Sequence, residues 1–391
     1  MTLDIERARR DTPGCERVLH FNNAGSSLPP SAVLDAQIGY LNLESQIGGY
    51  EAVDREHEQI EHVYDAAATM IGCSRDEIAI IENATRAWDM AFYSVPLGPG
   101  DRILTAKAEY ASNFISCLQV AGRTGARVEV IPNDEHGQVS IEALQGMLDS
   151  DVKLISITHV PTNSGLVNPV AEIGVVAKQA GALYLVDACQ SIGQMPVNVD
   201  DIGCDMLSTT GRKYLRGPRG TGFLYVRDSI VEQLEPPFLD LHAAQLTSAD
   251  TYAVRTDARR FENWETNYAA KVGLAAALDY ALDWGVESIW ERVQLLASAL
   301  RRRLIRIPGV AVHDRGEVTC GIVTFTVEAW HPVDVRRELT AQSINVTASG
   351  DSVKLQMEER GVTGLVRASV HYFNTEGEIE RFARAIESLR A

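Results

Sequence analysis

The stretch Leu183-Tyr184-Leu185-Val186-Asp187-Ala188-Cys189-Gln190 decides the fold of this chain, together with Ser208-Thr209-Thr210-Gly211-Arg212-Lys213-Tyr214. The first stretch starts as an apolar run and reaches a carboxylate. The second starts as a β-rich run and reaches a lysine, 213 − 187 = 26 residues after Asp187. Successive strands of this kind are typical of a mostly parallel sheet, whose ligands bind at the carboxyl ends of the strands. We expect Asp187 and Lys213 to lie there together.

These two side chains favour one cofactor, pyridoxal 5′-phosphate (PLP). A lysine amine holds its aldehyde as a Schiff base, and an aspartate keeps its ring nitrogen protonated. We therefore predict that Lys213 is catalytic and that Asp187 binds the cofactor. Thr210 and Arg212 flank the lysine and are expected to complete the phosphate site. The fixed charge of Arg212 is also expected to lower the pKa of the Lys213 amine.

Short β-rich runs alternate with helical stretches through the middle of the chain. The β-rich runs are 79–81, 102–105, 127–132, 153–158, 183–186, 206–209 and 222–226. The helical stretches between them include 113–122, 141–148 and 170–179. Such alternation predicts an α/β fold in which helices cover both faces of a mostly parallel sheet.

The pattern changes after the long helix predicted at 269–284. Helices at 289–305, 332–342 and 376–390 alternate with short strands at 310–313, 321–327, 344–347 and 365–370. This indicates a small α+β domain of about a hundred residues. We predict an N-terminal segment over 1–30 that packs on the site, a large cofactor-binding domain over 31–285, and a small domain over 286–391.

A phosphate site is predicted where the 79–81 run meets Glu82-Asn83-Ala84-Thr85-Arg86. Small and hydroxylated residues that open a helix supply free backbone N–H groups and the positive end of the dipole. Ala84, Thr85 and Arg86 fit that role once Lys213 is considered. The alternative is a plain Asn or Thr N-cap.

Three more side chains are candidates for the site. Tyr110 follows the 102–105 strand and is suited to stack on a pyridine ring, although a half-buried core tyrosine is the alternative. Gln190 follows Asp187 by three residues and is suited to bond the ring hydroxyl oxygen, with a surface glutamine as the alternative. Arg367 lies within the apolar strand at 365–370. Burial of an arginine there is unfavourable without a partner, which favours a site for the substrate carboxylate over a structural ion pair.

Composition excludes several classes of protein. The 391 residues are 45% hydrophobic and 23% charged, with a net charge of −17, which argues against nucleic acid and anionic membranes as partners. The six cysteines are scattered without metal-ligand spacing, so we expect reduced thiols and no metal site. The mixed-charge N-terminus and the lack of a long apolar run predict a cytoplasmic protein.

The ordered motifs resemble those of the class V aminotransferases, the fold-type I PLP group that includes cysteine desulfurases, C–S lyases and isopenicillin N epimerase-like proteins. The resemblance covers nearly the whole chain. It is carried by Asn22-Asn23-Ala24-Gly25, Asn83-Ala84-Thr85, Thr158–Gly165, Asp187–Gln190, Thr210–Lys213, Arg260-Phe261-Glu262 and Arg367-Ala368-Ser369. It implies a seven-stranded, mostly parallel central sheet with a smaller α+β C-terminal domain.

The resemblance also implies roles for individual residues. Lys213 forms the Schiff base, Asp187 pairs with the ring nitrogen, and Gln190 meets the ring oxygen. The substrate carboxylate is expected at Arg367, and the substrate also at Asn23 and Ala24. Asn163 lies near the family's substrate-contacting asparagine and joins the cofactor-binding set. The resemblance further implies a homodimer with each site at the subunit interface, which Asn263–Asn267 crosses to reach the partner's phosphate.

The sequence departs from desulfurases in three places. Tyr110 stands where they have a stacking histidine, and Arg212 where many have a phosphate-binding histidine. Persulfide-forming desulfurases carry a nucleophilic cysteine on a mobile loop before the carboxylate-binding arginine. Here the corresponding stretch, 345–364, has no cysteine. Part of a lid over the substrate is expected at 349–359.

We therefore predict a PLP-dependent lyase that acts on a β-substituted amino acid, a cysteine conjugate or its sulfoxide. The reaction is α,β-elimination to pyruvate and ammonia. One alternative is a class V aminotransferase. Another is an epimerase that uses Tyr110 or His159 as a second base. A non-enzymatic protein on an inactive PLP fold is disfavoured by the presence of Lys213, Asp187 and Arg367.

Overall fold

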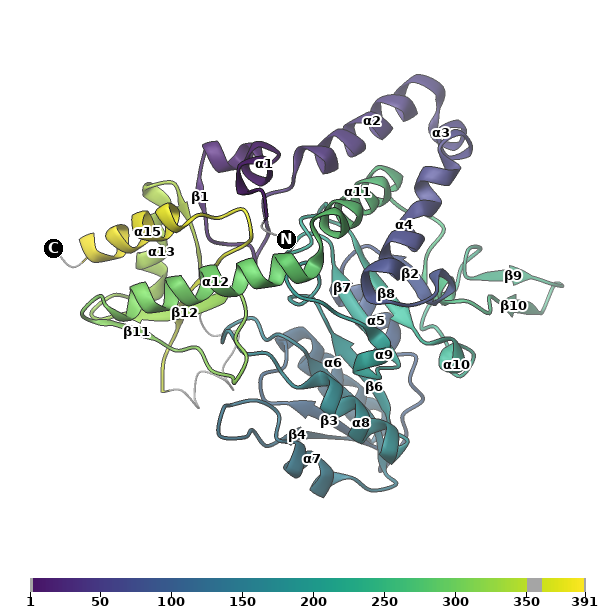
Figure 1. Ribbon diagram of the computed structural model, residues 1–391. Helices are drawn as coiled ribbons and strands as arrows, with labels where there is room; N and C mark the ends of the chain where they lie inside the picture. The colour runs from purple at the N-terminus through teal and green to yellow at the C-terminus, as the bar shows by residue number, and fades with distance from the viewer. Residues whose placement is uncertain (1–2, 350–360, 390–391) are drawn as a thin grey trace.

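A seven-stranded sheet forms the centre of the computed structural model, which describes residues 3–349 and 361–389 (Figure 1). Its strands are, in spatial order, β2 (Ile78–Ile81), β8 (Gly222–Val226), β7 (Met206–Thr210), β6 (Leu183–Asp187), β5 (Val152–Thr158), β3 (Arg102–Ala106) and β4 (Arg127–Ile131). Neighbours from β7 to β4 are parallel, whereas β8 runs antiparallel to both β7 and β2. The predicted mostly parallel sheet is confirmed.

Side chains of each strand alternate between two apolar cores, one on each face of the sheet. On β6, Tyr184 and Val186 belong to one core and Leu185 belongs to the other. This explains why the strands read as continuous apolar runs. The helices of this part of the chain are α4 (His57–Ile71), α5 (Ala84–Phe92), α6 (Ala111–Thr124), α7 (Ile141–Met147), α8 (Val170–Ala180), α9 (Val199–Ile202), α10 (Asp228–Val231) and α11 (Tyr268–Trp284).

The carboxyl ends of five strands meet at one edge of the sheet. Thr158 ends β5, Asp187 ends β6 and Thr210 ends β7. Thr158 lies opposite Asp187 in the register of β5 and β6. β2 and β3 run in the same direction, so the residues that follow them reach the same edge. The fold therefore gathers polar groups from five separate segments in one place.

The C-terminal domain has an antiparallel sheet in the order β11-β12-β15-β14. Its elements are α12 (Val286–Ile305), β11 (Val310–Val312), β12 (Ile322–Val327), α13 (Pro332–Ala341), β13 (Ile344–Asn345), β14 (Thr347–Ser349), β15 (Leu365–Ser369) and α15 (Glu376–Ser388). The strand predicted at 344–347 is two strands in the structure. β13 pairs with β1 (Leu19–His20), while β14 pairs with β15, and the two different partners explain the break.

The N-terminal segment joins both parts of the molecule (Figure 1). β1 pairs in parallel with β13, and the ring of Phe21 lies 4.9 Å from that of Phe382 in the C-terminal core. Ala8, in contrast, belongs to a core of the large sheet. The helices are α1 (Ile5–Arg10), α2 (Ser31–Ile47) and α3 (Gly49–Arg55). The predicted domain boundaries at 30/31 and 285/286 stay predictions.

The remaining elements are short. They are β9 (Ala244–Leu246), β10 (Tyr252–Val254) and the 3-10 turns Pro13–Glu16, Arg75–Glu77 and Ala258–Phe261. The β9–β10 hairpin was not predicted, because its residues are largely exposed and lack an apolar face. Within residues 3–349 and 361–389, no helix is both long and apolar enough to cross a bilayer. No three metal-ligating side chains cluster in that part of the chain either.

Candidate active site

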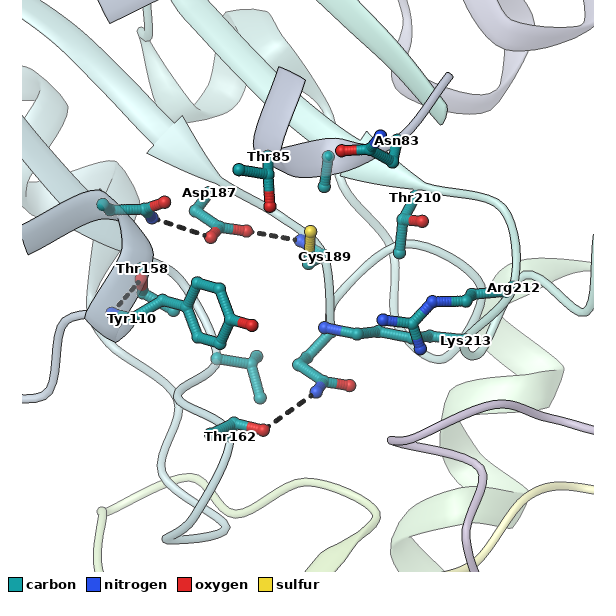
Figure 2. A pocket seen from close by; sticks show the side chains of 14 residues that line it. Asn83, Thr85, Tyr110, Thr158, Thr162, Asp187, Cys189, Thr210, Arg212 and Lys213 are labelled. Carbon is teal, nitrogen blue, oxygen red and sulfur yellow. Dashed lines mark hydrogen bonds between the residues drawn. The ribbon is translucent and has the colours of Figure 1, made fainter. Parts of the chain in front are cut away.

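A cavity of about 260 Å³ opens at the carboxyl edge of the large sheet. Figure 2 shows that Lys213 and Asp187 both point into it, with the ring of Tyr110 on the same side as Asp187. The lining residues are Asn83, Ala84, Thr85, Tyr110, Asn113, Thr158, Val160, Thr162, Asp187, Cys189, Gln190, Thr210, Arg212 and Lys213. Eight of the side chains predicted from the sequence are therefore brought together.

The Lys213 amine faces the Tyr110 ring, with 6.0 Å between Nζ and the ring centroid. Burial is the main cause that lowers the pKa of this amine. The negative charge of Asp187 opposes that effect, and the positive charge of Arg212 adds to it. The expected influence of Arg212 is present, but burial is the larger cause. A lysine with a lowered pKa is a better base and nucleophile near neutral pH.

The loop that carries Lys213 is held by two unusual backbone positions. Gly193 has φ = 89°, and an added Cβ would lie 2.4 Å from the Leu215 nitrogen, so only glycine fits there. Arg216 has φ = 65° and is almost fully buried. Its guanidinium donates to Thr12 Oγ1 at 2.5 Å and to the Leu28 carbonyl at 2.9 Å. These contacts fix the loop against the N-terminal segment.

Asp187 is buried and accepts two hydrogen bonds. The Cys189 backbone N–H donates to Oδ1 at 2.9 Å, and Asn113 Nδ2 donates to Oδ2 at 3.0 Å (Figure 2). These two donors fix the plane of the carboxylate. Neither Asn113 nor this contact was predicted, because the bond joins residues 74 positions apart.

The N-terminus of α5 forms another wall of the cavity. Asn83 caps the helix, and its side chain accepts from the backbone N–H of Arg86. Ala84 and Thr85 line the cavity, whereas the Arg86 side chain bonds Glu82 and lies over the ring of Phe238. The cap and the cavity wall therefore occur at the same helix end. Thr210 and Arg212 line the cavity as well.

Arg367 lies beside the cavity, behind Thr162. Its Nη1 donates to Thr162 Oγ1 at 2.6 Å and to the Thr162 carbonyl at 3.1 Å. Gln190 Nε2 also donates to Thr162 Oγ1, at 3.3 Å, and to the Ala24 carbonyl at 3.0 Å. No carboxylate in the described part of the chain pairs with Arg367, and its Nε has no partner there. Burial lowers the pKa of this guanidinium to about 10.

The other predicted residues lie around the cavity and not in its lining. Asn23 donates to the Ser369 carbonyl and accepts from Ser27, so it fastens the N-terminal turn to β15. Ala24 contacts the site through its carbonyl. Asn163 is buried beside the lining residue Thr162. His159 is buried, and burial lowers its pKa to about 4.

Comparison with known proteins shows the family of this chain. The model of the family Aminotransferase class-V matches residues 19–382. A probable cysteine desulfurase of Methanothermobacter thermautotrophicus is 31% identical over 396 residues, which cover 99% of this chain and 98% of the relative. The apo structure of a cysteine desulfurase from Thermococcus onnurineus NA1 has a TM-score of 0.93 and 29% identity, and covers 100% of this chain and 98% of the other.

A more distant structure has the same fold. The cystine C–S lyase C-DES, in complex with its reaction product cysteine persulfide, has a TM-score of 0.87 at 23% identity, covering 96% of this chain and 99% of the other. A mostly parallel seven-stranded sheet with this C-terminal domain is that of the fold-type I PLP-dependent enzymes. The chain belongs to the class V aminotransferase family, and it is a PLP-dependent enzyme similar to cysteine desulfurases.

Proposed function

We propose that this enzyme cleaves the C–S bond of a cysteine conjugate or its sulfoxide by α,β-elimination. For a conjugate with side chain CH2–S–R, water is consumed, and R–SH, pyruvate and ammonium are released. No oxidant or reductant is needed. The observation that carries the proposal is a complete set of groups for PLP chemistry together with a stretch, 345–364, that contains no cysteine.

The residues of the cavity fit PLP in chemistry and arrangement. An amine, a carboxylate and a helix N-terminus are the partners that an aldehyde, a pyridine nitrogen and a phosphate require. Lys213, Asp187 and the Ala84–Thr85 turn supply them, and Thr210 and Arg212 would complete the phosphate site. Gln190 Oε1 lies buried with no partner among the described residues, as expected of a group beside an additional ligand.

When bound, PLP makes the Cα proton of an amino acid acidic by spreading the resulting charge over its ring. In our proposal the Lys213 amine accepts that proton, for which its lowered pKa is suited. Asp187 holds a proton at the ring nitrogen. Tyr110 would lie over one face of the bound ring and help to exclude water. Arg367 binds the substrate carboxylate and so sets the orientation of the Cα–H bond.

A persulfide relay is disfavoured by the positions of the cysteines. Stretch 345–364 lacks one, although residues 350–360, including most of the expected lid, lie outside the described residues. Of the six cysteines, all within the described residues, Cys189 alone lines the cavity. Burial raises its pKa well above the ordinary value, which keeps it a thiol and a poor nucleophile. Cys320 is fully buried, two residues before β12 begins.

We also propose that the enzyme is a homodimer. Leu34, Ile38 and Leu41 are about half exposed and lie on one face of α2, at helical spacing. Beside them, a cavity of about 790 Å³ lies between α2, α3 and the segment 263–267. An exposed apolar face of this kind is typical of a protein interface. Light scattering on the purified protein should give twice the chain mass, and a monomer at micromolar concentration would contradict the proposal.

The function is tested with purified protein loaded with PLP and offered a panel of cysteine S-conjugates, their sulfoxides, cystine and alanine. Elimination predicts pyruvate and ammonium in equal amounts. The sulfur product is the thiol from an S-conjugate, the sulfenic acid from a sulfoxide, and the persulfide of cysteine from cystine. An aminotransferase would instead convert an added 2-oxo acid to its amino acid. An epimerase would release no pyruvate, yet would exchange the Cα hydrogen for deuterium and invert the centre. Either of these results with no pyruvate would refute the lyase.

A further inference from the structure

A second buried carboxylate, Glu109, lies behind Asp187. Glu109 lies between β3 and α6, and it is 9% exposed. It does not line the cavity, and none of the roles proposed above uses it. Figure 2 shows its chain neighbour Tyr110 and the strand-end residue Thr158 on the Asp187 side of the cavity. A buried carboxylate without an assigned role beside a cofactor site needs an explanation.

Four donors converge on this carboxylate. The Tyr110 backbone N–H donates to Oε1 at 2.8 Å and Asn113 Nδ2 donates to it at 2.9 Å, and the Thr158 hydroxyl is also bonded to Oε1. The Thr105 hydroxyl donates to Oε2 at 3.1 Å. No lysine, arginine or histidine in the described part of the chain forms an ion pair with Glu109. The site is therefore built for a carboxylate but leaves its charge unpaired.

Asn113 connects the two carboxylates. Its amide nitrogen has two hydrogens, and one bonds Glu109 Oε1 while the other bonds Asp187 Oδ2. Since the amide plane is rigid, the position of Glu109 fixes the direction from which Asp187 is held. Loss of the Glu109 acceptor would let the amide rotate and release that constraint.

The surroundings of Glu109 contain few other charges. Thr105 and Thr158 face it from β3 and β5, Asp187 from β6, and Asn113 and Cys117 from α6. The cations Arg212 and Lys213 lie across the cavity. Burial, followed by the charge of Asp187, raises the pKa of Glu109 to about 7. A cation placed against Asp187 would favour the ionised form of the Glu109 carboxylate.

We propose that Glu109 is a positioning residue that orients Asp187 through Asn113 and adds a second negative charge behind the ring nitrogen of bound PLP. This inference rests on the proposed role of Asp187. The paired carboxylates together hold the proton on the ring more firmly than one alone. The same negative field favours the protonated form of the Schiff base at Lys213, since it acts across the cavity.

The test is Glu109→Gln, which keeps an oxygen acceptor for Asn113 and removes the charge. The readout is the pH titration of the visible absorbance of bound PLP. Loss of a negative charge disfavours the protonated chromophore, so the midpoint should fall by about one pH unit. We expect kcat to fall about tenfold while KM changes less than about twofold. Glu135→Gln, at a side chain 88% exposed, is the matched control and should leave the midpoint unchanged.

A midpoint in Glu109→Gln equal to that of the wild type would overturn the inference. If that variant does not fold, Thr105→Val replaces it. Loss of a hydroxyl that donates to Glu109 Oε2 should disfavour the ionised carboxylate and lower the midpoint in the same direction by a smaller amount. An unchanged midpoint in Thr105→Val would then overturn the inference. A wild type that binds no PLP at Lys213 would refute the proposed function itself, which is a distinguishable result.

Discussion

Two arginines of the C-terminal domain, one partly buried and one buried, have opposite surroundings. Arg301, on α12, donates to Asp314 at 2.7 Å and to the carbonyls of Cys320 and Ile322. Arg367, on β15, donates only to neutral oxygens among the described residues and lies beside the cavity. Both side chains are largely removed from water, so each requires compensation. One is compensated within the fold, and the other is suited to a carboxylate brought by a ligand. The difference separates a structural arginine from a binding arginine.

The largest expected effect comes from Arg367→Gln. The substitution would remove a bidentate contact to the substrate carboxylate. This should lower kcat/KM about a thousandfold, which corresponds to roughly 4 kcal/mol of lost transition-state binding. The thermal midpoint should change little, because no internal ion pair is broken. Steady-state kinetics and calorimetry measure the two quantities. Arg367→Lys keeps the charge but cannot form the bidentate contact, so its kcat/KM should lie between those of Arg367→Gln and the wild type. Equal kcat/KM values for Arg367→Gln and the wild type would show that Arg367 does not bind the substrate carboxylate.

The opposite result is expected at the structural arginine. Asp314→Asn leaves the Arg301 charge buried and poorly compensated, which should lower the free energy of unfolding by about 3 kcal/mol. kcat/KM at a temperature where the variant is folded should stay within about threefold of wild type. The exposed pair Arg337–Asp334 supplies the control, because Asp334→Asn should cost less than about 1 kcal/mol. An Asp314→Asn variant with unchanged stability and a strongly lowered kcat/KM would contradict the structural role of Arg301.

A smaller effect is expected at Tyr110, a cavity-lining residue that is 42% exposed. Tyr110→Ala should weaken PLP binding about five- to tenfold, through loss of about 1 kcal/mol of ring stacking. Tyr110→Phe keeps the ring and should bind PLP as the wild type does. Equilibrium dialysis measures both affinities. If Tyr110→Phe binds PLP as weakly as Tyr110→Ala, the hydroxyl contributes to binding and the stacking of the ring does not.

Sequence reasoning located the side chains that follow from chain order. Asp187 and Lys213 come after apolar strands, and strand ends of a parallel sheet converge, so their meeting was predictable. Arg367 was recognisable because a charge within an apolar strand needs a partner. The sheet, the alternation and most helices followed from the same periodicity.

The missing parts depend on contacts that the sequence does not encode locally. Glu109 and Asn113 meet Asp187 across strands, and no local pattern distinguishes them from a polar helix start. Within the loop after β5, Val160 and Thr162 line the cavity and Asn163 does not, which depends on how the loop bends. The break between β13 and β14 arises because two different strands compete for one segment.

The most direct test is borohydride reduction of the PLP-loaded enzyme, followed by digestion and mass spectrometry of every lysine-containing peptide. Lys271, on α11, is an internal control. It is also buried, but its Nζ lies 3.8 Å from the Glu262 carboxylate oxygen Oε2. We expect one reduced cofactor per chain, attached at Lys213, with Lys271 unmodified. A cofactor fixed at another lysine, or none fixed at all, would contradict it.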